Sequence, residues 1–234
     1  MRNLTLALLL CFSIPTVPLA AEEPQATAPK KVKVQTQESQ AAMTPDRALN
    51  RLKAGNARFV SNTMKKRDWS AKVMATASGQ FPFAAILACM DSRAPIEIVF
   101  DQGVGDVFAL RVAGNVVNDD ELGSLEYAAK VGTKVIVVLG HTGCGAVKGA
   151  IDDVKLGNLT GLLAKIRPAV AAASCSDSKD DACVTKVSVK NVLQSMKGIP
   201  AGSPYLKKYL DDGKVNLVGA MYDLSTGKVT FLEN

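Results

Sequence analysis

Aromatic residues are scarce in this sequence: they make up 5% of it, against 47% hydrophobic residues in all. A full core is possible, but it must be built mainly from valine, isoleucine, leucine and alanine. Beyond the first 21 residues, no apolar segment is long enough to cross a bilayer. The formal net charge is +6, yet lysine and arginine form no dense block and are not interleaved with aromatic residues. We therefore expect a solvated surface and no nucleic-acid binding.

Residues 1–21 are typical of a signal peptide. Arg2 gives a short positive region, and Leu4 to Ile14 form an apolar stretch. Ala20 and Ala21 then offer small residues for cleavage. The apolar stretch is too short and too proline-interrupted for a membrane span. We predict export, to the periplasm if the source is a Gram-negative bacterium, and no stable membrane insertion after the signal is removed.

Residues 22–43 are rich in alanine, glutamine, lysine, threonine and proline, without apolar periodicity. This composition predicts a flexible linker or a loosely packed arm. The folded domain is expected over 44–234. Thr44 is a good helix N-cap, Pro45 suits the first helical position, and Asp46 complements the helix dipole.

Strand-like and helix-like patterns alternate along the domain. Short apolar runs predict strands over 83–88, 106–112, 134–139, 215–221 and 229–232. One helix is predicted to begin at residue 44. Further helices are predicted over 94–101, 119–131, 143–151, 159–173, 181–196 and 203–213. Thr226-Gly227 predicts a tight hairpin turn between the last two strands. The alternation predicts an α/β fold: a mainly parallel four-stranded sheet plus an antiparallel edge strand, flanked by helices.

The sequence has five cysteines and no Cys-x-x-Cys motif, which argues against a redox thiol pair. Cys11 lies in the signal peptide. Cys175 and Cys183 are close together in a polar stretch. In an oxidising compartment this spacing favours a disulfide, the alternative being two free thiols on a loop.

His141 is the only histidine in the sequence. It follows the most hydrophobic predicted strand, and Cys144 comes three residues later. Cys89 ends another buried strand. If the two strands are neighbours, two thiolates and one imidazole converge at one sheet edge. Zinc accepts this mixture of ligands tetrahedrally, with one position left open.

Other interpretations of these residues stay open at this point. A cysteine at a strand end is often a small core residue. The glycines at 140, 143 and 145 would also suit a phosphate-binding loop, but the usual Lys-Ser/Thr ending is missing. A non-catalytic zinc module would need a fourth protein ligand. A zinc hydrolase would usually need another acid or base near the metal, for which Glu126 is the nearest candidate.

Two motifs resemble the paired signature of the β-carbonic anhydrases: Cys89-Met-Asp-Ser-Arg93 and His141-Thr-Gly-Cys144. The similarity extends over residues 44–233. It includes the segments Arg111 to Asn115, Ser124 to Tyr127 and Gly219 to Gly227. The resemblance implies a zinc enzyme that interconverts carbon dioxide and bicarbonate, and a homodimer or homotetramer.

The resemblance also implies roles for single residues. Cys89, His141 and Cys144 would be the zinc ligands. Asp91 and Arg93 would form an ion pair beside the metal. The remaining implied residues would contact substrate or line the pocket, some of them across a dimer interface: Gln80, Phe108, Ala113 and Tyr127.

Asp91 could in principle leave Arg93 and fill the open zinc position. Some family members regulate this change through a bicarbonate pocket that contains a tryptophan three residues before the first cysteine ligand. Ile86 stands at that place here. We therefore expect an open site, with Asp91 held by Arg93. Because the only histidine would be a metal ligand, we also expect proton release to depend on water or buffer.

Overall fold

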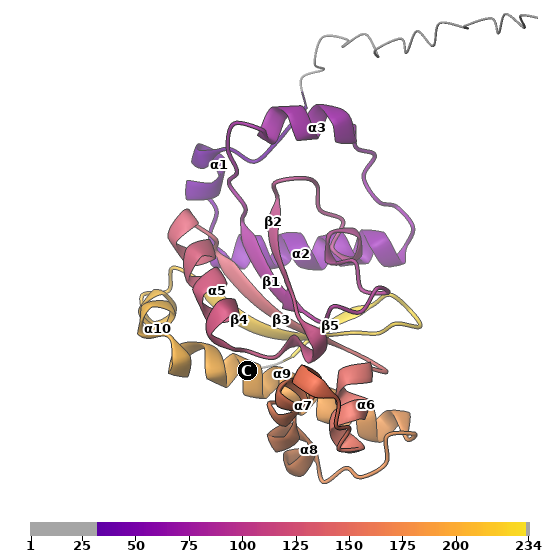
Figure 1. Ribbon diagram of the computed structural model, residues 1–234. Helices are drawn as coiled ribbons and strands as arrows, with labels where there is room; N and C mark the ends of the chain where they lie inside the picture. Colours follow the sequence, from indigo (N-terminus) through magenta and orange to yellow (C-terminus); the bar gives the residue numbers. More distant parts are fainter. Residues whose placement is uncertain (1–31, 233–234) are drawn as a thin grey trace, which may run out of the picture. The chain divides into compact units, whose positions relative to one another are not determined.

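The computed structural model describes residues 32–232 (Figure 1). The predicted signal peptide and residues 22–31 of the predicted linker lie outside this range. Within it, no helix combines the length and apolar character that a bilayer span requires.

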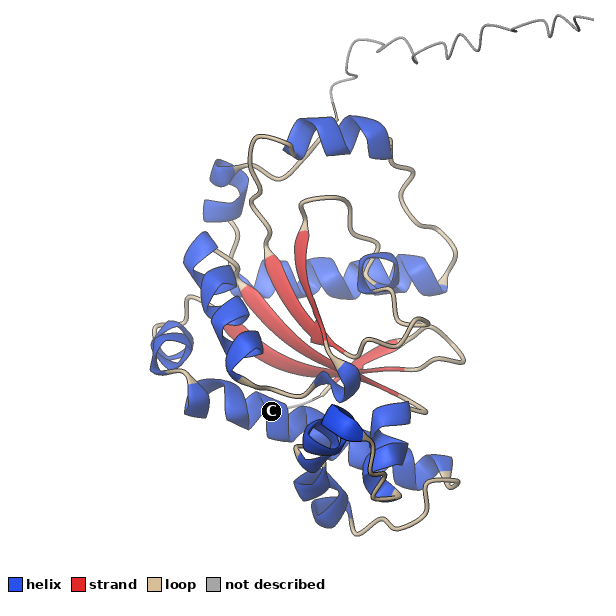
Figure 2. Cartoon of the chain, viewed as in Figure 1, coloured by secondary structure: helices blue, strands red, loops and turns tan. Residues whose placement is uncertain are grey.

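A five-stranded sheet forms the centre of the described domain, in the order β2-β1-β3-β4-β5 (Figures 1 and 2). The strands are β1 (Ala84–Ala88), β2 (Val107–Arg111), β3 (Val135–His141), β4 (Asn216–Tyr222) and β5 (Val229–Phe231). The first four are parallel, and β5 pairs antiparallel with β4. The predicted fold class is confirmed.

The helices pack around this sheet and at its carboxyl edge. They are α1 (Gln37–Ala41), α2 (Pro45–Val60), α3 (Trp69–Thr76), α4 (Ile96–Val99), α5 (Asp119–Val131), α6 (Gly145–Ile151), α7 (Gly157–Ala164), α8 (Arg167–Ala173), α9 (Asp181–Gly202) and α10 (Pro204–Asp211). A 3-10 turn, η1, spans Ala113–Asn115.

Successive side chains of the inner strands point to opposite faces of the sheet. Val135 and Val137 of β3 pack with Leu52 of α2 on one face. Ile136 and Val138 pack with α5, α9 and α10 on the other. Because β3 is buried on both faces, its sequence is a continuous apolar run. A third apolar cluster, from α6, α7, α8 and the start of α9, lies beside Cys89 and Cys144.

Three local differences from the predicted elements have clear physical causes. The helix predicted over 159–173 is two helices, because Pro168 removes a backbone donor and its ring crowds the carbonyl of the residue four before it. The helix predicted over 94–101 is only Ile96–Val99, since Pro95 biases the residue before it away from helix. Helix α3, capped by the Asp68 side chain, was not predicted.

The end of the segment predicted as a flexible linker is ordered. Thr36 and Ser39 form a capping box around the start of α1. Gln40 is buried, and its Nε2 donates to the Pro82 carbonyl at 2.7 Å. A capping box and one buried amide order a polar segment without any apolar periodicity, so the pattern-based prediction did not find it.

The hairpin between β4 and β5 has a longer loop than the predicted two-residue turn. Tyr222 pairs with Val229, so six residues connect the strands. Asp223 organises the loop: its Oδ1 accepts from the backbone nitrogen of Ser225 at 2.7 Å, and its carbonyl accepts from Gly227 at 2.8 Å. Gly227 has a φ of 75°, which suits glycine.

Candidate metal centre

The three predicted ligands meet at the carboxyl edge of the sheet. Strands β1 and β3 are direct neighbours, with Ala88 opposite Leu139. Cys89 follows β1, and His141 is the last residue of β3. Cys144 is the N-cap of α6, two residues beyond Thr142. Gly143, at a φ of 62°, makes the tight turn that returns Cys144 toward His141.

The ligand atoms of these residues form a compact, buried group. All lie within 4.8 Å of one another. The exposed fractions of Cys89, His141 and Cys144 are 5%, 1% and 1%. The two sulfurs are 4.0 Å apart and are not bonded. Two thiolates on one tetrahedral zinc, each at about 2.3 Å, would lie roughly 3.8 Å apart, so the observed spacing fits the ion.

The histidine ring is oriented for a metal. Its Nδ1 lies 2.8 Å from the Thr142 carbonyl, which holds the ring proton on that nitrogen. Its Nε2 is buried and has no hydrogen-bond partner in the described part of the chain. A buried lone pair without a donor is unfavourable, and a cation between Nε2 and the two sulfurs would satisfy it.

The two thiols have opposite pKa shifts. The pKa of Cys89 is lowered, because Cys144 donates a hydrogen bond to it and the Gly114 N–H adds another at 3.3 Å. The pKa of Cys144 is raised, since its bond to Cys89 and its burial both favour the protonated thiol. A metal that bound both sulfurs would displace the remaining proton.

Asp91 and Arg93 form a bidentate ion pair beside the cysteine and histidine side chains. Arg93 donates from Nε to Asp91 Oδ1 at 2.9 Å and from its terminal nitrogen to Oδ2 at 2.7 Å. These bonds hold the pKa of Asp91 well below its ordinary value. Asp91 Oδ2 is 3.9 Å from His141 Nε2. The carboxylate therefore stays charged and close to the metal-facing atoms while Arg93 holds it.

Arg111, at the end of β2, fixes the loop that carries Cys89 and Asp91. Its Nε donates to the Cys89 carbonyl at 3.2 Å, and its terminal nitrogen donates to the Asp91 carbonyl. One guanidinium thus sets the backbone positions of Cys89 and of Asp91.

The residues predicted to line the substrate pocket do not all gather here. Ala113 lies in η1, directly before the Gly114 N–H that contacts Cys89. Phe108 and Tyr127 contact each other edge to face, 5.8 Å apart, in an open groove on β2 and α5. Gln80 is exposed and precedes β1, whereas Cys89 follows it. Gln80 therefore lies at the opposite end of β1 from the metal centre of its own chain.

Two polar residues of α9 support the site and were not found from the sequence. Asn191 Nδ2 donates to the Gly114 carbonyl at 2.6 Å, and Ser195 Oγ donates to the Asn115 carbonyl at 3.0 Å. Both residues are buried. They clamp η1, whose Gly114 N–H contacts Cys89 Sγ. A polar residue inside an otherwise amphipathic helix is the only sequence signal for such a role.

Cys175 and Cys183 are joined by a disulfide, with their α-carbons 5.5 Å apart. It connects the end of α8 to the start of α9, in the apolar cluster beside Cys89 and Cys144. In the described residues, Cys89 and Cys144 are the free cysteines.

Fold and site together define an α/β protein with a buried two-cysteine, one-histidine metal-binding group at the carboxyl edge of its sheet. Residues 84–229 match the sequence profile of the carbonic anhydrase family. The chain belongs to this family, in its β class, and is a carbonic anhydrase enzyme.

Individual relatives agree with this assignment. The chain is 35% identical to carbonic anhydrase 2 of Mycobacterium tuberculosis, over 81% of this chain and 94% of the relative. It superposes on a β-carbonic anhydrase of Aspergillus fumigatus with a TM-score of 0.64 and 26% identity, covering 76% and 89% of the two chains. Tetrameric β-carbonic anhydrases of Sordaria macrospora share the fold, with a TM-score of 0.63, 24% identity and coverage of 70% and 91%.

Proposed function

We propose that this enzyme hydrates carbon dioxide reversibly to bicarbonate and a proton, with zinc held by Cys89, His141 and Cys144. The observation that carries the proposal is the buried Nε2 of His141, which has no hydrogen-bond partner in the described domain and faces two sulfurs. Three protein ligands leave a fourth position for solvent, as catalytic zinc requires. When bound, zinc supplies Lewis-acid chemistry that makes water nucleophilic near neutral pH; carbonic anhydrase is itself the standard example.

The protein side chains would orient and stabilise the reactants. Asp91, kept charged by Arg93, can accept a hydrogen bond from the attacking water and so direct its lone pair. We propose that Asp91 remains on Arg93 at neutral pH, which leaves the metal open to substrate. A crystal structure near pH 7 with an Asp91 oxygen on the metal would contradict this open state.

We further propose that a second copy of the chain completes the pocket. Phe108 and Tyr127 form an open groove, and Tyr127 is 56% exposed. Gln80 lies at the far end of β1 from its own metal centre. These residues can contribute to catalysis only at a partner's site, so the working form is a homodimer or a homotetramer. The tetrameric fold relatives of Sordaria macrospora support such an assembly.

The N-terminal sequence supports export, and we propose a periplasmic location. Residues 1–21 would be removed as a signal peptide, and residues 22–31 would precede the folded domain. The disulfide between Cys175 and Cys183 is consistent with an oxidising compartment. Cell fractionation of the native source, with N-terminal sequencing of the mature protein, tests this directly.

The activity is tested by adding purified protein to dissolved carbon dioxide and following acidification with a pH indicator. We expect rapid acidification, its loss after prolonged chelation, and its recovery with stoichiometric zinc. Protein that is fully active while free of metal would refute the zinc proposal. Zinc-loaded protein without activity would instead indicate a structural metal.

A further inference from the structure

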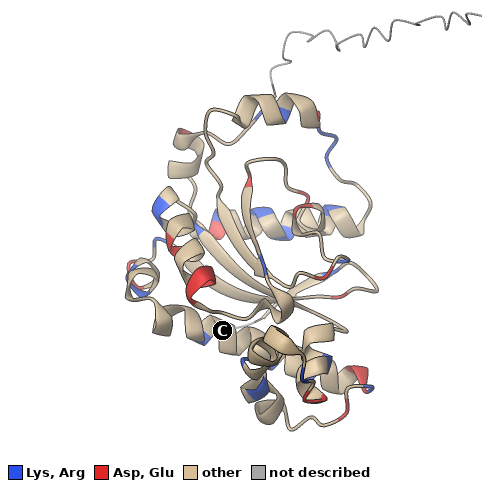
Figure 3. Cartoon of the chain, viewed as in Figure 1, with Lys and Arg blue, Asp and Glu red and all other residues tan. Residues whose placement is uncertain are grey.

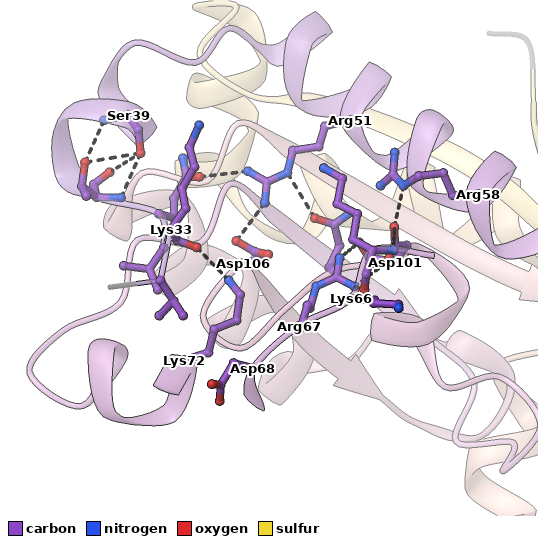
Figure 4. A pocket seen from close by; sticks show the side chains of 16 residues that line it. Lys33, Ser39, Arg51, Arg58, Lys66, Arg67, Asp68, Lys72, Asp101 and Asp106 are labelled. Atoms are coloured by element: carbon purple, nitrogen blue, oxygen red, sulfur yellow. Dashed lines mark hydrogen bonds and ion pairs between the residues drawn. The ribbon is translucent and has the colours of Figure 1, made fainter. Parts of the chain in front are cut away.

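A strongly basic cavity lies near the amino ends of the strands, far from the metal centre. Its volume is about 720 Å³. Its walls come from residues 32–39, from α2, from the loop over 65–68 and from the start of α3 (Figure 4). Asp106, which also lines the cavity, directly precedes β2. We call residues 32–43, the described part of the predicted linker or arm, the arm, and we name this space the arm cavity.

Cations outnumber carboxylates in the walls of the arm cavity, with seven lysine and arginine side chains against three aspartates. The arginines and two of the aspartates already satisfy each other. The carboxylate of Asp101 is fully buried and is held by Arg58 at 2.5 Å and by Arg67. Arg51 pairs with Asp106 at 2.8 Å. These three arginines and two aspartates form an ion-pair framework on one side of the cavity, with one positive charge in excess.

The four lysines of the arm cavity have no such partners. Figure 3 shows the basic loop that leads into α3. Within residues 32–232, no carboxylate forms an ion pair with Lys33, Lys65, Lys66 or Lys72. Asp68, the remaining aspartate, caps α3 by accepting from a backbone N–H. The cavity therefore holds an excess of positive charge.

Lys72 is the most informative of these lysines, because it is buried. Only 9% of the residue is exposed. In the described domain, its Nζ has a single acceptor, the Lys33 carbonyl at 3.1 Å (Figure 4). The terminal atoms of the Lys72 side chain pack against Gly103, where an added Cβ would lie 3.0 Å from Nζ. A buried ammonium with one neutral acceptor is costly unless a negative charge lies nearby.

We infer that the arm cavity binds a small phosphate-bearing anion with at least two negative charges. The guanidinium groups that would grip a carboxylate with two parallel bonds are committed to Asp101 and Asp106. The unpaired donors are ammonium groups, which surround a tetrahedral anion as point charges. A monovalent anion such as bicarbonate would leave most of this charge unbalanced.

The arm contributes directly to the proposed anion site. Lys33 belongs to the arm, and its carbonyl holds the ammonium of Lys72. Gln35 is fixed by Arg51, which donates to its Oε1 at 2.9 Å. The same basic side chains therefore hold the arm and line the cavity. This inference does not depend on the catalytic proposal, since it uses none of the metal-site residues.

The test is calorimetric titration of zinc-loaded protein with fructose 1,6-bisphosphate and, separately, with inorganic phosphate. Ionic strength is kept constant with chloride. We expect one bisphosphate per chain, and tighter binding than for inorganic phosphate. Lys72→Met and the double variant Lys65→Gln/Lys66→Gln should each weaken binding about tenfold or more, because each removes charge-assisted hydrogen bonds.

The matched control is Lys186→Gln/Lys190→Gln on α9, which removes the same two charges from exposed positions elsewhere. It should bind like the parent protein. Cys89→Ser, titrated without zinc beside zinc-free parent protein, should also keep the binding, which separates this site from the metal centre. Lys72→Met is interpreted only if its unfolding transition is intact, whereas the Lys65/Lys66 variant changes exposed side chains and stays informative.

Three outcomes would overturn the inference. Equal affinity in the lysine variants and the control would mean non-specific attraction to a basic protein. Loss of binding in Cys89→Ser alone would place the anion at the metal centre. Tighter binding of citrate than of the bisphosphate, under the same conditions, would refute the phosphate class.

Discussion

The ring of His141 illustrates how one residue can define the chemistry of the site. Its Nδ1 is held by the next residue's carbonyl, so only Nε2 can bind a metal. If Nε2 binds the proposed zinc, the only histidine in the sequence cannot take part in proton transfer. Proton release should then depend on water or buffer.

At the residue scale, we predict that substituting a proposed ligand abolishes metal binding and turnover together, whereas substituting Asp91 affects turnover alone. Cys89→Ser, and likewise His141→Ala, should lose both zinc and activity, because two remaining ligands bind zinc poorly. Asp91→Asn should keep stoichiometric zinc but lose most turnover, since the amide cannot replace the charged acceptor. Elemental analysis beside carbon dioxide hydration rates measures both. Zinc loss in Asp91→Asn would contradict the roles assigned here.

A second prediction at this scale concerns acid stability and Asp101. Burial alone would raise its pKa, but hydrogen bonds from Arg67 and Arg58 hold the pKa below the ordinary value. Its contribution to stability is therefore present above about pH 4, the unfolded-state value, and is lost as the pH falls through the folded value. Asp101→Asn should lower the unfolding free energy at pH 7 by roughly 3 kcal/mol.

Urea unfolding between pH 7 and pH 3 measures this effect. The difference between Asp101→Asn and the parent protein should shrink as the pH falls. Asp211→Asn, which removes an exposed ion pair with Lys207, should cost under about 1 kcal/mol at pH 7. A constant difference at every pH would show that Asp101 contributes by packing and not by charge.

At the element scale, helix α9 connects the domain core to the metal centre. Its Asn191 and Ser195 hold the carbonyls of η1, and Gly114 of η1 donates to the sulfur of Cys89. Gly114 has a φ of 69°, and an added Cβ would meet Ile166 at 2.6 Å. The η1 turn is therefore tightly packed, and the side chains of α9 hold it in position.

We predict that Asn191→Leu weakens zinc retention without touching a ligand. The substitution leaves the Gly114 carbonyl buried without its donor, at a cost of about 1–3 kcal/mol. Loss of such outer-shell support typically lowers metal affinity about 10–100-fold. Competition with a chromophoric chelator measures the affinity. Gln194→Leu, which removes a 2.6 Å bond from the same helix to Lys165, should leave zinc affinity unchanged; equal losses in both variants would refute the assignment.

The disulfide between α8 and α9 gives another element-scale prediction. Cys175 and Cys183 are eight residues apart, and closing such a short loop stabilises a protein by roughly 2–3 kcal/mol in the chain-entropy description. Cys175→Ser/Cys183→Ser should unfold at a correspondingly lower urea concentration and still bind zinc. If the double variant is as stable as the parent protein, the bond makes no net contribution.

At the scale of the whole molecule, the groove on β2 and α5 leads to a prediction about assembly. Tyr127→Glu should place a charge in the proposed contact between copies, shift sedimentation toward monomer and lower turnover together. Tyr205→Glu on α10 changes another half-exposed tyrosine in the same way and should do neither. A fully active monomer would contradict the proposal that a partner completes the pocket.

The sequence alone was sufficient for the five strands, for a mainly parallel sheet with an antiparallel edge strand, and for the three ligand candidates. Buried parallel strands are apolar runs that stand out, and the cysteine and histidine motifs at the ends of β1 and β3 mark the carboxyl edge. The sequence could not predict α1, which depends on a capping box and one buried amide. It also did not predict that the helix expected over 159–173 is divided into α7 and α8. Such local hydrogen bonds and proline effects leave no periodic pattern.

Only the tertiary structure determined which distant polar groups meet. Nothing in the spacing of Asn191 indicated that it supports the turn that contacts Cys89. Likewise, nothing in the spacing of Lys72 indicated that it lies buried beside a basic cavity. The tertiary structure also showed that Gln80, Phe108 and Tyr127 lie away from the metal centre of their own chain. The physical reason is that ligand motifs follow strand ends and are local in sequence, whereas supporting contacts and cavities arise from packing between elements far apart along the chain.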